Sequence, residues 1–416
     1  MSTTTSQNFD QTIHSLISKL VPSQRFMIYG CYGYTGELIV KLVRDCGLLK
    51  KVVLAGRNRS SLEDMLKRLK IDKSEVEYQV FSLDQDSEVI DEQVRKVDLV
   101  LLVAGPFVIT SKAMVESCLR CGAHYLDITG EAPVFQSILE NDTVKKQACE
   151  IDIILMPGVG FDVVPTDCLS KKLEEEFSSR FGKEKTTQPN AQLELAINVG
   201  STAVQTSRGT TKSAINMLRQ GTWGFPERVN GVIQPMPRVV KEFPFYKNGQ
   251  TATQPVTCVS VPWGDIATAY VSTGVPNVRV YFSSSKNAAT VAKIMNIWLF
   301  NFLFFLFFNL PFVVPLMFKL IDWFMPKGPE ENPESRVHIY GELFHRDNPA
   351  TYKVCGRAQA KAGYLFTADS ALLIALKILT KTGLKKHSGC LTPSLAFGAD
   401  FLNEIDGCKV EIVEEE

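Results

Sequence analysis

Short apolar runs alternate with amphipathic segments along the first 165 residues of the chain. Each run has the length of a buried strand, and the segment after it repeats its apolar residues with the period of a helix. Strands that alternate with helices at this rhythm predict an α/β fold with a doubly wound parallel sheet, a Rossmann domain. The predicted strands are residues 26–30, 50–56, 76–83, 98–105, 123–129 and 152–160.

A different pattern occupies residues 297–318, which read IWLFNFLFFLFFNLPFVVPLMF and contain no charged side chain. A helix of this length rises roughly 33 Å at 1.5 Å per residue, which is enough for the hydrocarbon layer of a bilayer. Pro311 and Pro315 interrupt such a helix, and Lys293 and Lys319 flank the apolar stretch. A stretch that is apolar on every side needs burial in protein or in lipid, and we expect lipid here.

The sequence on both sides of this stretch indicates how it meets a membrane. Residues 337–416 look like the continuation of the domain that precedes it, so a single crossing would put parts of one domain in different compartments. A hairpin that turns near Asn309–Pro311, or two short helices at the interface, keeps both parts on one side. Trp298 and Trp323 suit the depth of the headgroups. We expect insertion into one leaflet or a lipid-droplet monolayer, with a homodimer interface as the alternative.

Composition narrows the functional classes. A chain of 416 residues predicts two or three domains. Its 45 basic side chains balance 45 acidic ones, so no bulk field attracts nucleic acid. The first 24 residues lack the pattern of a secretory signal. We therefore expect a protein that is not secreted and that faces the cytoplasm on a lipid droplet or on the endoplasmic reticulum, with its ten cysteines as thiols.

Three glycines follow the first predicted strand, as Gly30, Gly33 and Gly36, and a helical pattern begins directly after them. Gly30 permits a tight turn, Gly33 leaves room for a pyrophosphate at the helix N-terminus, and Gly36 lets helix and strand approach each other. This strand, turn and helix predict a dinucleotide site.

The end of the second predicted strand indicates which nicotinamide coenzyme binds. An NAD site usually has a carboxylate there, whereas this chain reads AGRNRSS, with Arg57 and Arg59. A guanidinium suits the 2′-phosphate of NADP(H). The sequence therefore favours NADP(H) over NAD(H); a pair of surface arginines is the alternative.

The carboxyl ends of the later strands carry polar side chains, and ligands bind at these ends in parallel sheets. Asp127, Glu131 and Asp162 are carboxylates at this edge, and Tyr125 is a candidate proton donor. The alternatives are helix caps for the three carboxylates and a core position for the tyrosine. The five histidines form no cluster, and the sequence predicts no metal site.

Several segments in order resemble the saccharopine dehydrogenase-like oxidoreductases and related enoyl reductases. The segments are AGRN, VAGPF, AHYLDITGE and GFDVVPTD, then SRGTTKSAINML (207–218), AKAGYLFTADSALLIALKIL (360–379) and GCLTPSLAFGADFLNEI (389–405). The resemblance extends over nearly the whole chain from Arg25 onward. It implies a second α/β domain with a mixed sheet and a C-terminal segment that packs back on the body.

The resemblance also implies roles for single residues. It places Gly105 and Pro106 on the nicotinamide side, Arg57 at the adenosine phosphate and Asp84 near the adenine. The residues that it places at the pyrophosphate are Gly30, Tyr32, Gly33, Tyr34, Thr35 and Gly36. The residues that recognise glutamate and lysine in true saccharopine dehydrogenases are not evident here, so saccharopine is a poor candidate substrate.

Together these patterns predict an NADP(H)-dependent oxidoreductase that acts on a lipid-like substrate at a membrane or lipid-droplet surface. The alternative is a nucleotide-binding scaffold on lipid surfaces without catalytic activity. The expected domain boundaries are 1–24 for a helical leader, 25–165 for the Rossmann domain, 166–292 with 337–416 for the second domain, 293–326 for the membrane-associating hairpin and 327–336 for a linker.

Overall fold

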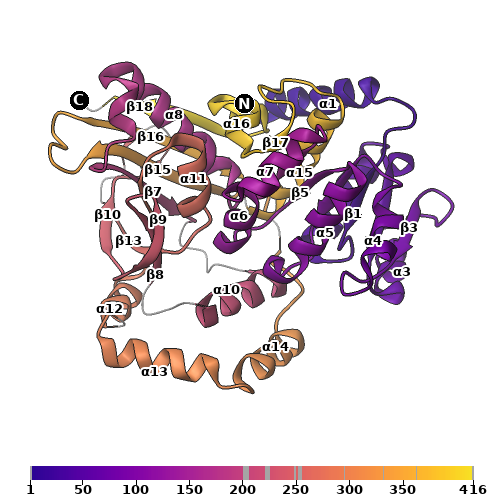
Figure 1. Cartoon of the computed structure of the whole chain (residues 1–416), viewed down its shortest axis with the longest axis horizontal. Helices are drawn as coiled ribbons and strands as arrows, with labels where there is room; N and C mark the ends of the chain where they lie inside the picture. The colour runs from indigo at the N-terminus through magenta and orange to yellow at the C-terminus, as the bar shows by residue number, and fades with distance from the viewer. Residues whose placement is uncertain are drawn as a thin grey trace. The chain divides into compact units, whose positions relative to one another are not determined.

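The computed structural model describes residues 2–199, 206–220, 225–247, 250–251, 255–294, 296–330, 332–361 and 363–414. The chain divides into two compact units. Unit 1 comprises residues 1–164 and 363–407, and unit 2 comprises residues 165–362 and 408–416. Each unit is built around its own sheet (Figure 1).

The sheet of unit 1 contains seven strands, all parallel, in the order β17-β6-β5-β4-β1-β2-β3. The predicted doubly wound parallel sheet is thereby confirmed. Every residue of β1, β2 and β4 is buried, because helices cover both faces of such a sheet. The strands are β1 (Phe26–Tyr29), β2 (Val52–Gly56), β3 (Glu77–Val80), β4 (Leu99–Leu102), β5 (His124–Asp127), β6 (Ile154–Met156) and β17 (Gly389–Cys390).

Helices lie before, between and after these strands. The first helix, α1, precedes β1 and occupies most of the expected N-terminal leader. The helices of unit 1 are α1 (Ser2–Lys19), α2 (Tyr34–Asp45), η1 (Leu49–Lys51), α3 (Arg59–Arg68), α4 (Ser87–Val94), α5 (Phe107–Cys121), α6 (Ala132–Leu139), α7 (Asp142–Glu150), α15 (Gly363–Leu379), α16 (Pro393–Phe397) and η2 (Ala399–Glu404).

Residues 363–407 belong to unit 1, so their predicted assignment to the second domain is wrong. β17 extends the parallel sheet beside β6, where Gly389 pairs with Ile154. α15 packs against α2 and is buried almost throughout from Phe366 to Leu379. A helix that is apolar on nearly every side must be buried on nearly every side, and the core of unit 1 buries α15 in this way.

The sheet of unit 2 is mixed, as the resemblance implied. β14 runs parallel to β7, while β15, β16 and β18 pair in antiparallel fashion. The main strand order is β10-β13-β14-β7-β15-β16-β18, and β8 and β9 branch from β14. The strands are β7 (Ala191–Asn198), β8 (Phe225–Val229), β9 (Val232–Met236), β10 (Val240–Phe243), β13 (Val256–Val261), β14 (Asn277–Ser283), β15 (Arg336–His345), β16 (Lys353–Lys361) and β18 (Lys409–Val413), with the small pair β11 (Tyr246–Lys247) and β12 (Gln250–Thr251).

One face of this second sheet packs closely on a helix. A Cβ built on Gly341 of β15 would lie 2.9 Å from Leu173 Cδ1, so the missing side chain lets the helix approach the strand. That helix is α8 (Val164–Phe181). The other helices in this part of the chain are α9 (Lys183–Thr186), α10 (Arg208–Gln220), α11 (Asp265–Thr273), α12 (Lys286–Ile294), α13 (Trp298–Asn309) and α14 (Val313–Phe324).

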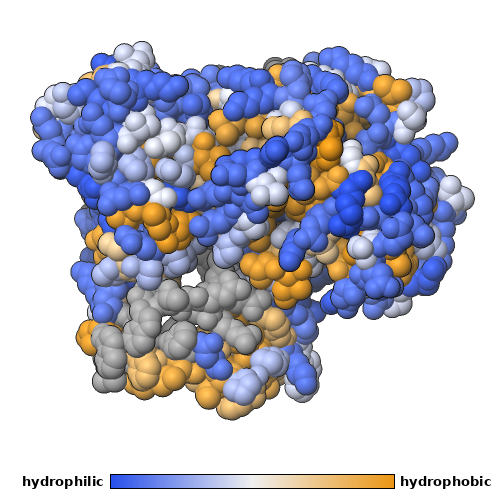
Figure 2. Space-filling model, in the orientation of Figure 1, coloured by the Kyte–Doolittle hydropathy of each residue, from blue (hydrophilic) through white to orange (hydrophobic). Residues whose placement is uncertain are grey.

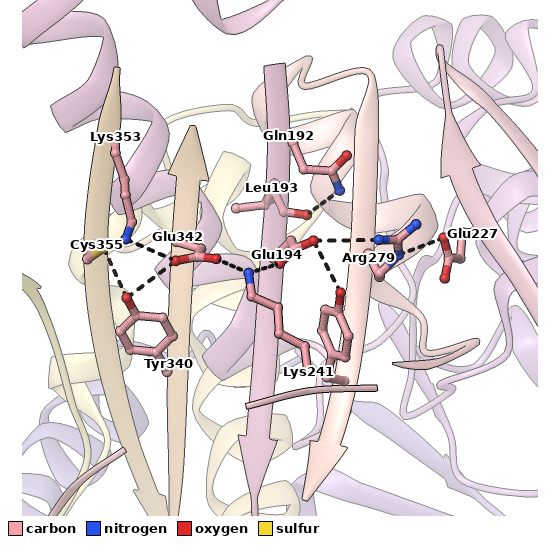
Figure 3. A network of polar contacts seen from close by, with 11 residues as sticks. Gln192, Leu193, Glu194, Glu227, Lys241, Arg279, Tyr340, Glu342, Lys353 and Cys355 are labelled. Atoms are coloured by element: carbon pink, nitrogen blue, oxygen red, sulfur yellow. Dashed lines mark hydrogen bonds and ion pairs between the residues drawn. The ribbon is translucent and has the colours of Figure 1, made fainter. Parts of the chain in front are cut away.

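A network of charged side chains lies on the sheet of unit 2 (Figure 3). Glu194 and Glu342 are directly paired on neighbouring strands and are only 5% and 7% exposed. The Nζ of Lys241 lies 2.6 Å from Glu194 Oε2 and 2.5 Å from Glu342 Oε1. Arg279 Nε donates to Glu227 Oε2 at 2.8 Å. Opposite charges thus compensate one another where buried carboxylates would otherwise repel.

The apolar stretch forms two helices rather than one. α13 ends at Asn309 and α14 begins at Val313, with Pro311 in the connection and Pro315 in the first turn of α14, where proline is tolerated. Among the described residues, no helix has both the length and the apolar character required to span a bilayer. The side chain of Trp298 lies outside the described part of the chain.

These two helices lie against α10 (Figure 1). Phe308 of α13 and the side chains of Val314 and Ile321 of α14 are buried in one cluster with Ile215 of α10. One face of α13 and one face of α14 therefore pack against α10.

Replacement of Lys241 by methionine should destabilise unit 2. It leaves Glu194 and Glu342 paired on adjacent strands with less compensation, and we expect a loss of about 1–3 kcal/mol in the free energy of unfolding. Urea unfolding measures it. The control is Lys67→Met, at an exposed position of α3 where the lysine Nζ lies 3.7 Å from Asp64 Oδ1. This change should shift the free energy of unfolding by less than about 0.5 kcal/mol. Equal effects of the two variants would contradict the role assigned to Lys241.

Candidate coenzyme site

The turn after β1 has room only for glycine at two positions. Gly30 has a φ of +91°, and a Cβ built there would lie 2.7 Å from the Cβ of Ala104. A Cβ on Gly36 would lie 2.5 Å from the carbonyl oxygen of Gly30 and 2.8 Å from that of Cys31. Backbone therefore touches backbone at the point where strand β1 and helix α2 meet.

Gly33 stands at the N-cap of α2, and its N–H donates to the carbonyl of Gly30 at 2.9 Å. The first N–H groups of a helix have no partners within the helix, and the helix dipole favours an anion there. β1 lies between β4 and β2, at the switch point where doubly wound sheets bind their ligands. The cradle is of the kind that holds a pyrophosphate.

Tyr32 and Tyr34 tie this turn to other parts of unit 1. The ring of Tyr32 covers Gly56, since a Cβ built on Gly56 would lie 2.4 Å from Tyr32 Cε1. Its hydroxyl accepts a hydrogen bond from the N–H of Asn58 at 3.2 Å. Tyr34 meets the ring of Tyr364 edge to face. Thr35, in the first turn of α2, is partly buried.

The two arginines after β2 differ in their surroundings. Arg59 lies 4.0 Å from Glu63 and 5.9 Å above the ring of Tyr78. Arg57 is exposed directly after the strand. The pKa of Asp84 lies below its ordinary value because of hydrogen bonds from the Ser82 side chain and its own backbone, and the Arg57 charge adds to this effect. Arg57 and Asp84 thus lie near enough for their charges to interact, and their role at the adenosine end stays a prediction.

Glu131 holds the first turn of helix α5, next to the cis peptide bond between Gly105 and Pro106. Its Oε1 accepts from the N–H of Phe107 at 3.1 Å, and its Oε2 accepts from the N–H of Val108 at 2.8 Å. The side chain is only 3% exposed. The alternative that Glu131 caps the helix after it is not met, because Glu131 stands at the N-cap of α6 without a side-chain hydrogen bond there. Its carboxylate instead accepts from the first N–H groups of α5, which precedes it in the sequence.

Tyr125 does not fit the predicted role of proton donor. Its side chain is fully buried, and its hydroxyl donates to Asp127 Oδ2 at 2.7 Å. Burial and the Asp127 charge raise the pKa of Tyr125 well above its ordinary value. The prediction was wrong because a strand covered on both faces offers no exposed side. Asp127 Oδ1 in turn accepts from the N–H groups of Thr129 and Gly158, both at 2.9 Å.

Asp162 remains as a partly exposed carboxylate in the loop after β6. Its Oδ2 would lie 2.8 Å from a Cβ built on Gly130. Burial, followed by the charge of Glu131, raises the pKa of Asp162 to about 7. Burial also raises the pKa of Asp127 to about 6. Two carboxyl groups with raised pKa values thus lie at the carboxyl ends of β5 and β6.

The sequence did not predict that the first two turns of α15 lie beside the loop after β6. Thr367 Oγ1 accepts from the N–H of Phe161 at 3.0 Å, and Ser370 Oγ donates to the carbonyl of Val159 at 2.7 Å. The only signal was the resemblance of residues 360–379 to a family segment. In the described ranges no group of three or more His, Cys, Asp or Glu side chains could hold a metal ion.

Comparison with known proteins finds similarity in the first part of the chain. Residues 26–151 match the family model described as the saccharopine dehydrogenase NADP binding domain. The trans-acting enoyl reductase of Mycobacterium tuberculosis is 24% identical over 150 residues, and the match spans 35% of this chain and 35% of that protein. A lipid droplet localized protein of Caenorhabditis elegans is 25% identical over 156 residues, 36% of each chain.

Two further similarities cover most of the chain. The human saccharopine dehydrogenase-like oxidoreductase is 22% identical over 419 residues, covering 89% of this chain and 92% of that protein. The solved structure of a saccharopine dehydrogenase (L-Glu forming) from Saccharomyces cerevisiae has a TM-score of 0.52 at 11% identity, over 94% of this chain and 100% of the other. This structural similarity shows a shared fold.

Replacement of Asp162 by asparagine should flatten the pH dependence of stability. The folded protein keeps the Asp162 proton to a pKa of about 7, against an ordinary value of 3.8. Below the ordinary pKa, Asp162 is protonated in both the folded and the unfolded chain and does not lower the free energy of unfolding. As the pH rises from there to about 7, that free energy falls by at most about 1.4 kcal/mol per pH unit, because the unfolded chain releases the proton first. Partial exposure makes the slope smaller. Urea unfolding at several pH values from 4 to 8 measures this slope. Asp64→Asn, at an exposed position, is the control. Identical pH profiles for wild type and Asp162→Asn would contradict the raised pKa.

The geometry and the comparisons agree on the coenzyme. The glycine turn at residues 30–36 leaves space for a pyrophosphate. The family whose model matches this region is named for NADP, which is the coenzyme that the arginines after β2 predicted. Residues 26–151 are therefore similar to the NADP-binding domain of saccharopine dehydrogenases, which supports NADP(H) as the coenzyme.

Proposed function

We propose that this chain is an NADP(H)-dependent oxidoreductase that acts on a lipid-like substrate at the surface of a membrane or lipid droplet. The single observation that carries the enzymatic part is the glycine turn with Arg57 beside it, in a domain of an NADP-binding family. The lipid part rests on the exposed apolar side chains of α13 and α14 and on one relative that is named for its location on lipid droplets.

Within unit 1, the coenzyme would lie across the carboxyl ends of the strands. Arg57 would hold the 2′-phosphate, Asp84 would lie near the adenine, and Gly105 and Pro106 would line the nicotinamide side. The pyrophosphate would contact the turn formed by Gly30, Tyr32, Gly33, Tyr34, Thr35 and Gly36. When bound, the nicotinamide supplies hydride transfer, for which a protein mainly provides orientation.

The chain's own residues near the reacting end have separate tasks. Glu131 fixes the backbone at Phe107 and Val108 through two hydrogen bonds, so the adjoining turn is held in one position. Asp162, partly exposed and with a pKa raised to about 7, can hold or release a proton at neutral pH. It replaces Tyr125 as the candidate proton source.

The exposed faces of α13 and α14 support contact with lipid (Figure 2). Residues three or four apart along each helix point outward, while the stripe that contains Phe308, Val314 and Ile321 faces α10. A helix with one such apolar face lies in the plane of an interface. The outward side chains, 41% to 79% exposed, are Leu303, Leu306, Phe307, Leu310, Phe312, Leu316, Leu320, Trp323 and Phe324.

Polar contacts join both ends of the α13 and α14 pair to the rest of unit 2. Asn296, just before α13, exchanges two hydrogen bonds with the backbone of Arg238, at 2.7 and 2.8 Å. After α14, the carbonyl of Met325 accepts from Arg208 Nε at 2.8 Å. Lys212 Nζ lies 2.6 Å from Asp322 Oδ1. These contacts favour two interfacial helices over a hairpin that projects deep into the lipid.

A catalytically silent scaffold on lipid surfaces is the second candidate, because the Caenorhabditis elegans relative is named for its location and not for a reaction. Turnover separates the two candidates. Purified protein is incubated with NADPH and a panel of enoyl and keto lipids on vesicles, and absorbance at the nicotinamide band is followed. Oxidation of NADPH that depends on one lipid class supports the enzyme; coenzyme binding without turnover supports the scaffold.

Replacement of Arg57 by alanine should weaken NADPH binding and leave NADH binding nearly unchanged. Loss of hydrogen bonds to a phosphate costs about 1.5–3 kcal/mol, which corresponds to roughly 10- to 150-fold in affinity. Titration calorimetry with both coenzymes measures this selectivity. Arg95→Ala is the control, because Arg95 follows α4 directly and pairs with Glu88. Equal losses for the two coenzymes would contradict the phosphate role.

Polar substitutions on the exposed face of α13 and α14 should abolish lipid binding. We expect the combination of Leu306→Gln, Phe307→Gln, Phe312→Gln and Leu316→Gln to weaken flotation with phosphatidylcholine vesicles or triolein droplets by roughly tenfold or more, because each side chain buries apolar area in lipid. Val21→Gln with Val232→Gln, at residues 52% and 62% exposed elsewhere, is the control.

Two outcomes would contradict this account of the face. The substituted protein could still float with the lipid, which would place the contact elsewhere. The wild type could instead elute as a dimer that the substitutions convert to a monomer, which would make the face a homodimer interface.

A further inference from the structure

The first turn of α15 joins two loops of the coenzyme site from a distant part of the sequence. Tyr364 meets Tyr34 edge to face, with ring centroids 5.1 Å apart and planes at 87°. Two residues further on, Phe366 meets Phe161 at 6.1 Å and 81°. Tyr34 is the first residue of α2, in the glycine turn, and Phe161 lies in the loop after β6.

This turn of α15 is held firmly on the side of the β6 loop. Thr367 Oγ1 accepts from the N–H of Phe161 at 3.0 Å and donates to the carbonyl of Gly363 at 2.7 Å. A Cβ on Gly160 would lie 2.8 Å from Thr367 Cγ2, so helix and loop are in direct contact. Tyr364 therefore projects from a fixed backbone.

Tyr34 is the other partner in this contact. The side chains of Tyr34 and Tyr364 are both partly exposed, and an edge-to-face contact between two aromatic rings favours one relative orientation of the pair. The contact therefore favours the rotamer of Tyr34 that meets the Tyr364 ring. A side chain that is already ordered loses less entropy when a ligand binds next to it.

We propose that Tyr364 is a positioning residue for the coenzyme. Its ring holds Tyr34 in the conformation that the glycine turn needs for a pyrophosphate, so the C-terminal part of unit 1 tunes coenzyme affinity without touching the coenzyme. The inference rests on the proposed coenzyme site and adds to it a contribution from residues outside the matched region 26–151.

The test compares Tyr364→Ala, Tyr364→Phe, Tyr34→Ala and the double alanine variant. NADPH affinity is measured by calorimetry, and each melting temperature is recorded. We expect Tyr364→Ala to bind NADPH about two- to tenfold more weakly and Tyr364→Phe, which keeps the ring, to bind as wild type does. The double variant should bind no more weakly than Tyr34→Ala alone, because residues that act through one contact are not additive.

The matched control is Tyr352→Ala, since Tyr352 in unit 2 makes a similar edge-to-face contact with Phe181 at 5.3 Å and 85°. It should leave NADPH affinity unchanged. Wild-type affinity in Tyr364→Ala, or additive losses in the double variant, would overturn this proposal alone. If the wild type takes up no NADPH, the proposed coenzyme site falls and this inference falls with it.

Discussion

The contact on which the candidate coenzyme site depends is the one between the backbone of the turn after β1 and the backbone of α2. At Gly36 even a methyl group would meet two carbonyl oxygens within 2.8 Å, and at Gly30 it would meet Ala104 of the neighbouring chain segment at 2.7 Å. Because no side chain intervenes, the N-terminus of α2 lies directly above the strand end. A helix N-terminus in that position is favourable for binding an anion.

The other parts of the site follow from this geometry. Tyr32 leans over Gly56 and links the turn to the loop that carries Arg57. Glu131 fixes the start of α5 on the other side of β1. The buried Tyr125 and Asp127 hold the loop after β6 through Gly158. Buried polar groups thus act as supports, and the side chains left at the surface are those that would meet a ligand.

The sequence was sufficient where the local pattern determines the structure. The parallel strands read as short apolar runs, and the glycine spacing marks the turn. It was insufficient for β17, which is two residues long, and for α15, whose apolar residues on nearly all sides do not indicate which sheet covers them. Tyr125 was misassigned for a related reason: in a strand with two covered faces, period two does not distinguish inside from outside. The two helices in the apolar stretch were among the predicted alternatives because Pro311 marks the break.

The central claim is that the first unit takes up NADP(H) through this glycine turn and distinguishes it from NAD(H) by charge. Titration calorimetry of the well-folded wild-type chain with each coenzyme tests this most directly. The account predicts one NADPH per chain, bound more tightly than NADH, with the difference shrinking as salt screens the phosphate. Uptake of neither coenzyme, or equal affinity for both at low salt, would contradict it.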